Sequence, residues 1–178
     1  MQKVSFLFFI LFITAVFSSF QKKLPKETIQ WLTLEEAEMK YKQEPRPILV
    51  DLYTDWCGWC KVMDKKTYSN PSLIKYLNQK FYAVKLNAET KKDVTWNGKT
   101  YSFNPAYKTN DIALTLTKGE LAYPTTVFLP ADQSGPQPIA GYLELKEMEM
   151  MIKYYGENKY ITLPFDEYAK NFRPLWKK

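Results

Sequence analysis

The chain contains no histidine and only two cysteines among its 178 residues. Without histidine it cannot form a Ser-His or Cys-His catalytic pair, or a zinc site with a histidine ligand. Two cysteines cannot supply the four ligands of a structural zinc site, and they are too few for a disulfide-stapled scaffold. The two cysteines that are present, Cys57 and Cys60, have the spacing C-x-x-C. The chemistry of the chain is therefore sought around this pair.

Composition and charge exclude several other classes of protein. Hydrophobic residues make up 46% of the chain and charged residues 25%, which is typical of neither a disordered chain nor a polytopic membrane protein. The net charge is +6, but lysines alternate with glutamates in residues 35–40 and again in 144–153. Because no basic stripe forms, we expect no nucleic-acid partner.

The first twenty residues have the pattern of an export signal. Met1–Lys3 carries one positive charge, Val4–Phe17 is almost wholly apolar, and two serines precede a polar segment. The apolar run is shorter than the roughly 20 residues of a spanning helix. We predict a signal peptide over residues 1–20, with an uncleaved membrane anchor as the alternative. Both place the cysteines outside the cytosol, in the periplasm or the extracellular space, where disulfides persist.

Capping signals and hydrophobic periodicity predict alternating helices and strands in the first half of the chain. Thr33 and Glu36 form a capping-box pattern, and Asn70-Pro71 is typical of a helix start. The expected elements are a helix over 33–43, a buried strand over 48–53, a helix from the cysteines to about 67, a helix over 71–79 and a second buried strand over 81–86.

The second half is predicted to add a hairpin, two strands and two helices. Asn97-Gly98 lies between β-favouring flanks inside the polar segment 89–109, which predicts a type I′ hairpin. The other expected elements are a helix over 111–118, strands over 125–129 and 138–142, and a helix over 144–155 with Gly156 as its C′ residue. Phe165, Tyr168 and Phe172 recur at helical spacing in the tail, which favours a packed capping helix over a surface that recruits a partner. These elements indicate an α/β domain with a central mixed sheet flanked by helices.

Cys57 is expected at the start of the helix that follows the first buried strand. Backbone N–H groups and the helix dipole would lower its pKa below the free value of about 8.5, so Cys57 would attack and Cys60 would resolve the mixed disulfide. Gly58 would keep the approach open, and Trp56 and Trp59 would form an apolar collar. The alternatives for this spacing are half of a zinc site shared across a dimer and an inert structural disulfide.

Asp51 is the one acid inside an apolar strand, and Lys85 is the one charge in the next strand. A buried carboxylate is costly unless it is paired or neutralised, so Lys85 is its expected partner. A buried acid with a raised pKa behind Cys60 could accept and return the thiol proton during exchange. The alternative is that both residues end their strands in solvent.

The segment Ile48–Lys61 resembles the active-site strand and helix of the thioredoxin superfamily. Asp51 matches the buried acid of that family, 83–87 the strand with its lysine, 123–126 the loop with its cis-proline, and Gly141 a nearby glycine. The match covers about residues 46–155, and it is most similar to secreted thioredoxin-like proteins and the C-terminal domain of transmembrane thiol:disulfide interchange proteins. Two features depart from thioredoxin: Gly58-Trp59 replaces Gly-Pro, and residues 89–109 and 157–178 are additions.

The resemblance implies a thioredoxin fold with a hairpin insertion before the third helix of that fold, residues 111–118, and a C-terminal extension. It implies one domain over 21–178 and a thiol–disulfide oxidoreductase, expected to be a monomeric reductase of protein disulfides. We expect no bound cofactor or metal, and electron exchange with a separate partner such as a membrane thiol:disulfide interchange protein. The alternatives are an isomerase or oxidant, a redox-switched binding module, and a chaperone-like folding factor. The implied catalytic residues are Cys57, Cys60, Asp51 and Lys85, and the implied substrate-binding residues are Trp56, Gly58, Trp59, Tyr123 and Pro124.

Overall fold

The computed structural model describes residues 27–177, so the predicted export segment 1–20 lies outside the described residues. Within residues 27–177, every helix is too short or too polar to cross a bilayer.

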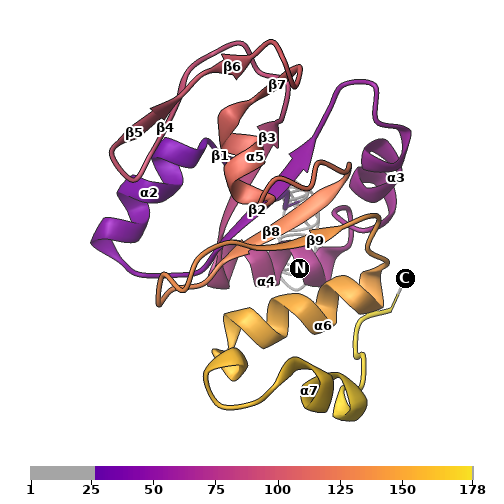
Figure 1. Cartoon of the computed structure of the whole chain (residues 1–178). Helices are drawn as coiled ribbons and strands as arrows, with labels where there is room; N and C mark the ends of the chain where they lie inside the picture. The colour runs from indigo at the N-terminus through magenta and orange to yellow at the C-terminus, as the bar shows by residue number, and fades with distance from the viewer. Residues whose placement is uncertain (1–26, 178) are drawn as a thin grey trace, which may run out of the picture.

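A five-stranded mixed sheet forms the centre of the structure (Figure 1). Its strand order is β1-β3-β2-β8-β9, in which β1 and β2 both run parallel to β3 whereas β8 and β9 pair antiparallel. The continuous apolar run around β2 fits its central position between β3 and β8. The strands are β1 (Trp31–Leu32), β2 (Ile48–Tyr53), β3 (Tyr82–Asn87), β8 (Thr125–Leu129) and β9 (Gln137–Ala140).

Helices cover both faces of this sheet because alternate strand residues point to opposite sides. On one face, Leu49, Ala83 and Phe128 pack with residues of α4 (Pro71–Lys80) and α6 (Leu145–Gly156). On the other face, Val50, Val84 and Val127 pack with residues of α2 (Leu34–Gln43) and α5 (Asp111–Leu116). The cysteine-containing helix α3 (Gly58–Lys66) follows β2 in sequence. Its Met63 side chain packs into the core on the sheet face that α4 and α6 cover.

The predicted helix starts are confirmed by their capping hydrogen bonds. Thr33 and Glu36 form the reciprocal capping box of α2. The Asn70 side chain accepts hydrogen bonds from two backbone N–H groups at the start of α4, with Pro71 as the first helical residue. The Asn110 side chain caps α5 by accepting a hydrogen bond from the backbone N–H of Ile112. These polar caps satisfy N–H groups that a helix leaves unpaired, which is why the sequence locates the helix starts well.

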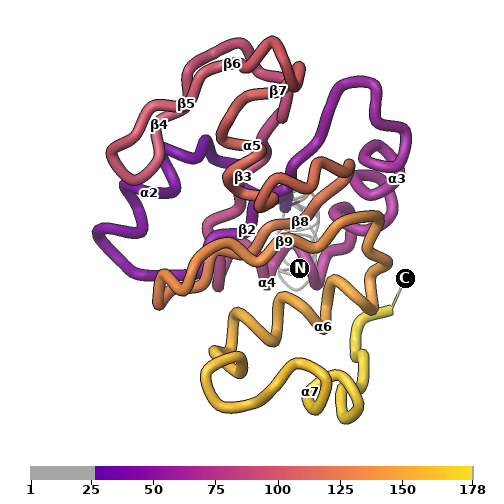
Figure 2. Tube along the Cα trace, viewed as in Figure 1, coloured from indigo at the N-terminus to yellow at the C-terminus, as the bar shows by residue number. Residues whose placement is uncertain are grey.

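The additional segment before α5 forms two small hairpins (Figure 2). Asn97 and Gly98 both have positive φ, at 51° and 71°, as a type I′ turn between β4 (Val94–Trp96) and β5 (Lys99–Tyr101) requires. A second pair, β6 (Phe103–Asn104) and β7 (Thr109–Asn110), follows. Carboxylates of α2 hold the first hairpin: Glu35 accepts from the backbone N–H of Thr95, and Glu38 accepts from that of Asn97.

Three predicted element ends need correction. Strand β9 ends at Ala140, not at residue 142, because Gly141 leaves the sheet with a φ of 98°. Helix α5 ends at Leu116, since Lys118 and Gly119 turn into the left-handed region. Gly156 is the last residue of α6, not its C′ residue, and Asn158 has the positive φ instead.

Gly156 is required for close packing, because an added Cβ would lie 2.8 Å from Phe81 and 3.0 Å from the Tyr76 hydroxyl. We expect Gly156→Ala to lower the free energy of unfolding by about 1–3 kcal/mol, measured by urea denaturation. Gly58→Ala is the control, since a Cβ there meets nothing within 4 Å and should raise stability by at most about 1 kcal/mol. Equal losses in both variants would contradict the packing explanation.

The C-terminal tail packs against α4 and α6, as its aromatic spacing predicted. After a 3₁₀ turn (Lys159–Ile161) and α7 (Phe165–Asn171), the chain returns along α6. Glu149 of α6 is fully buried and accepts hydrogen bonds from the backbone N–H groups of Leu175 and Trp176. These hydrogen bonds hold the end of the described chain against helix α6.

Candidate active site

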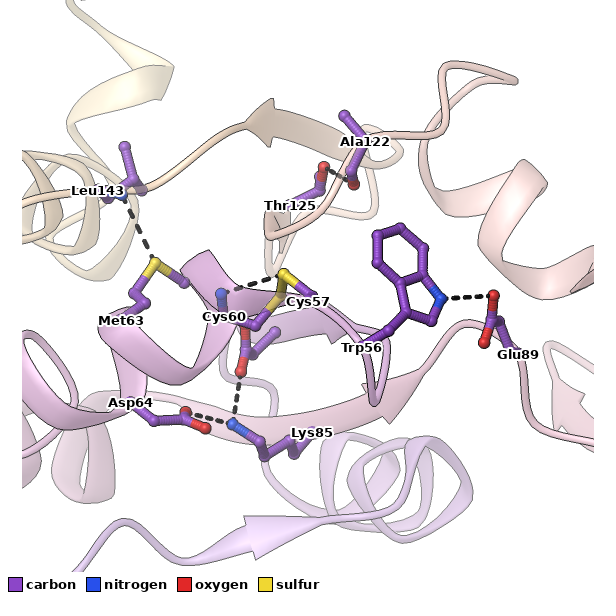
Figure 3. Close-up of a disulfide and its surroundings, with 11 residues drawn as sticks. Trp56, Cys57, Cys60, Met63, Asp64, Lys85, Glu89, Ala122, Thr125 and Leu143 are labelled. Atoms are coloured by element: carbon purple, nitrogen blue, oxygen red, sulfur yellow. Dashed lines mark hydrogen bonds and ion pairs between the residues drawn. A yellow bond between two sulfur atoms is a disulfide. The ribbon is translucent and has the colours of Figure 1, made fainter.

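A disulfide joins Cys57 and Cys60 at the point where β2 leads into α3 (Figure 3). The two Cα atoms are 5.3 Å apart, and each residue is almost fully buried. Cys57 is the N-cap of α3, and its Sγ accepts a hydrogen bond from the backbone N–H of Cys60 at 3.0 Å. A sulfur in this position faces the unpaired N–H groups of the helix start, which stabilise a thiolate.

Asp51 lies within β2, two residues before the end of the strand. It pairs in register with Lys85 of β3 and with Thr126 of β8, and it is 1% exposed. Burial raises the pKa of Asp51 from 3.8 to about 6, although the attraction of Lys85 opposes this rise. One carboxylate oxygen bonds Lys85, while the other, Oδ1, has no hydrogen-bond partner among the described residues. The alternative of a solvent-exposed strand end is therefore wrong for Asp51.

Lys85 connects this acid to the cysteine helix. Its Nζ donates to Asp51 at 2.9 Å and also contacts the carboxylate of Asp64 on α3 (Figure 3). The rings of Trp31, Tyr53 and Tyr68 surround the same ammonium at 5.2–5.8 Å. Burial alone would lower the pKa of Lys85, but the two carboxylates outweigh burial and raise it. Lys85 is therefore a fixed positive charge beside Asp51.

Asp64 is a site residue that the sequence analysis missed. It follows Cys60 by four residues, so both lie on one face of α3. The contact of Asp64 with Lys85 places the Asp51–Lys85 pair under this face. The i, i+4 spacing was available in the sequence, but Asp64 stands in a run of charges that resembles an ordinary solvated helix surface.

The peptide bond between Tyr123 and Pro124 is cis, as predicted from the family resemblance. It directly precedes β8, whose partner β2 leads to the cysteines. Figure 3 shows Thr125, the residue after Pro124, beside the disulfide, with its hydroxyl donating to the carbonyl of Ala122. The backbone N–H of Gly141 donates to the carbonyl of Pro124 at 2.8 Å, so the matched glycine supports the proline loop.

Two exposed tryptophans border the disulfide, and each is held by a second aromatic ring. Trp56 makes an edge contact with Tyr123 at 5.9 Å, and its indole N–H donates to Glu89. Trp59 lies against Tyr142 at 5.5 Å. Gly58 between them leaves open space. Glu89 and Tyr142 were not predicted as site residues, because both stand in loops whose positions the sequence does not specify.

Comparison with known proteins assigns the chain to a family. The family model Thioredox_DsbH, described as "Protein of unknown function, DUF255", matches residues 13–156. The chain is 31% identical over 107 residues, or 60% of its length, to the uncharacterized protein B0495.5 of Caenorhabditis elegans. It is 35% identical over 86 residues, or 48% of its length, to the thiol:disulfide interchange protein DsbD of Cronobacter sakazakii. These matches span only 13% and 12% of the two relatives.

Solved structures show the same fold at low sequence identity. The DsbH oxidoreductase superposes with a TM-score of 0.53 at 17% identity, covering 78% of this chain and 92% of the other. A thioredoxin-fold protein from Helicobacter pylori gives a TM-score of 0.54 at 15% identity and covers 71% of this chain and 79% of the other. The predicted thioredoxin fold is thereby confirmed. The family match over most of the chain, together with this fold and the helix-capping disulfide, establishes that the chain belongs to the Thioredox_DsbH family, DUF255, within the thioredoxin superfamily.

Proposed function

We propose that this protein is a thiol–disulfide oxidoreductase that reduces protein disulfides outside the cytosol. The observation that supports this most directly is the Cys57–Cys60 disulfide at the start of α3, with a buried, partly unpaired carboxylate on the neighbouring strand. The Thioredox_DsbH family match and the 35% identity to a thiol:disulfide interchange protein are consistent with this activity.

In the first step, the thiolate of Cys57 attacks one sulfur of the substrate disulfide. A bond forms between Cys57 Sγ and that sulfur, and the second substrate sulfur leaves as a thiolate. The backbone N–H of Cys60, which now bonds Cys57 Sγ at 3.0 Å, would stabilise the attacking anion. The exposed rings of Trp56 and Trp59 provide apolar surface for the substrate beside the sulfurs, and Tyr123 and Pro124 present the substrate backbone.

In the second step, Cys60 resolves the mixed disulfide. Its thiol proton passes to Asp51, its sulfur attacks Cys57 Sγ, and the remaining substrate sulfur leaves as a thiolate that takes up a proton. Two electrons move from the cysteine pair to the substrate, and Cys57 and Cys60 are left oxidised as they are in this structure. Lys85 holds Asp51 in place and balances its charge between cycles.

The oxidised pair is then reduced by a thiol donor outside residues 1–178, because Cys57 and Cys60 are the two cysteines that these residues contain. We propose a membrane thiol:disulfide interchange protein as this donor. Its dithiol would reduce the Cys57–Cys60 disulfide by the same two exchange steps in reverse.

The reduction potential of the cysteine pair tests the direction of the reaction. We expect a value near that of thioredoxin, about −270 mV, when the pair is titrated against dithiothreitol and glutathione. The variant with both Cys57→Ser and Cys60→Ser provides the baseline. A value towards about −120 mV would instead identify a disulfide donor or isomerase and overturn the proposed direction.

We further propose that residues 1–20 direct export and that residues 21–178 form one redox domain. The charge and hydropathy pattern of residues 1–20 supports the first proposal. Cell fractionation combined with the mass of the purified chain tests it. A full-length chain in the membrane fraction would identify an anchor, and a cytosolic chain would contradict export.

A further inference from the structure

Two aromatic walls border the disulfide, and both are built in advance of substrate binding. Trp56 and Trp59 are 66% and 61% exposed, yet rings of Tyr123 and Tyr142 hold them in place. The loop that carries Tyr142 is tied to α3 through the next residue, Leu143. Its N–H donates to Met63 Sδ, and its carbonyl accepts from the Thr67 hydroxyl.

The two walls differ in charge. Asn87, the last residue of β3, organises an acidic edge beside Trp56: its Nδ2 donates to Asp55, and its Oδ1 accepts from the backbone N–H of Glu89. Glu89 also accepts from the Trp56 indole. Within residues 27–177, neither Asp55 nor Glu89 forms an ion pair. This edge therefore presents two carboxylates that have no ion-pair partner among residues 27–177.

The other wall consists of the rings of Trp59 and Tyr142, and the residue that follows Tyr142 lies on the opposite side of the disulfide from Trp56. Figure 3 shows Leu143 on one side of the sulfurs and Trp56 with Glu89 on the other. Tyr142 immediately precedes Leu143, and its ring lies tilted against that of Trp59 at 5.5 Å. A chain that crosses the disulfide therefore meets the carboxylates beside Trp56 on one side and the rings of Trp59 and Tyr142 on the other.

We propose that the substrate is an extended protein segment whose cysteine stands between a basic side chain and a large apolar one. The basic group lies over Trp56 and pairs with Asp55 and Glu89. The apolar side chain packs against Trp59 and Tyr142. This specificity rests on the proposed function, since the segment is the partner that forms the mixed disulfide with Cys57. A small anionic disulfide such as oxidised glutathione is disfavoured, because its carboxylates meet the acidic edge.

Short peptides test this specificity. Each contains one cysteine, blocked as a mixed disulfide with thionitrobenzoate, and Arg and Phe flank the cysteine in both orders. Matched peptides replace Arg with Glu or Ser, and Phe with Ser. The reduced protein attacks the peptide sulfur and releases coloured thionitrobenzoate, which gives a second-order rate constant. We expect the preferred Arg/Phe order to react about tenfold faster than the Ser/Ser peptide. The Arg contribution should shrink in high salt.

Two variants test the two walls separately. For each variant we compare the ratio of its rate constants for two peptides, because a change in the fraction of folded protein affects both rate constants equally. Glu89→Gln should reduce the preference for Arg over Glu and keep that for Phe, whereas Tyr142→Ala should do the reverse. Glu167→Gln and Tyr107→Ala, which alter exposed residues elsewhere, should leave both ratios unchanged. Equal rates for all peptides would overturn this specificity but leave the oxidoreductase intact. No reaction with any peptide or with dithiothreitol would instead overturn the proposed function.

Discussion

Cys60→Ser should convert a protein that turns over into one that remains covalently joined to its substrate. Without the resolving thiol, the mixed disulfide on Cys57 has no internal route to release. We expect multiple turnover to fall by at least about a thousandfold, while the first attack continues. Mass spectrometry of the non-reduced protein after mixing with a disulfide substrate should show one adduct per chain.

Cys57→Ser is the matched control for this experiment. Cys57 is the N-cap of α3 and accepts the Cys60 N–H, so its loss should abolish the first attack and leave no adduct. Adducts on Cys60 in this variant, at a rate similar to those on Cys57 in Cys60→Ser, would show that the two cysteines do not have separate roles.

Asp51→Asn should slow the resolving step about 100-fold at pH 7, because it removes the group proposed to accept the Cys60 proton. In the natural chain this step should accelerate as pH rises through about 6, where Asp51 loses its proton. In the variant the acceleration should move above about pH 8, where the thiol ionises unaided. Single-turnover release from a preformed mixed disulfide measures both profiles.

Asp64→Asn is the control, since it alters the other carboxylate on Lys85 and leaves Asp51 intact. Because the charge of Asp64 raises the pKa of Asp51, this variant should keep the pH step and move it to lower pH. A step that persists near pH 6 in Asp51→Asn would assign it to another group.

The same acid affects stability in a predictable direction. Its pKa is higher in the folded chain than in the unfolded one, so the folded state binds the proton more tightly. The contribution of Asp51 to the free energy of unfolding is fully present below about pH 4 and is lost as pH rises through about 6. The total loss is about 3 kcal/mol. Urea denaturation of Asp51→Asn should therefore show a higher free energy of unfolding at pH 7 than that of the natural chain. A lower value would mean that the ionised carboxylate stabilises the fold.

The sequence predicted those parts of the fold that local chemistry determines. The capping residues Thr33, Asn70 and Asn110 and the Asn97-Gly98 turn satisfy backbone groups within a few residues, so their effect is readable without the fold. Strands β1, β6 and β7 have two residues each and were not predicted. A strand that short has no periodicity to detect, and its position depends on a distant partner.

In the site, too, the sequence predicted the residues that have a local signal and missed those that packing brings in. Asp51 and Lys85 were identified because each is the single charge in an apolar strand, and the parallel register of β2 and β3 brings them together. Asp64, Glu89 and Tyr142 were missed because helix packing and loop closure, not local sequence, bring them to the disulfide. Gly156 was misassigned because a glycine at a helix end suggests a positive φ, whereas here it allows close contact with Phe81.

The segment from Glu89 to Thr109 is closed at its base. The backbone N–H of Asn110 bonds the carbonyl of Ala88 at 2.7 Å, and the Thr109 hydroxyl bonds the same oxygen. The distance between the end of β3 and the start of α5 is therefore set by these bonds and not by the length of the segment between them. Lengthening, shortening or exchanging this segment should therefore leave in place the sheet that holds Asp51 and Lys85. Because Glu89 stands at its first position, such an exchange would change the surface beside Trp56 and leave the Cys57–Cys60 pair unaltered.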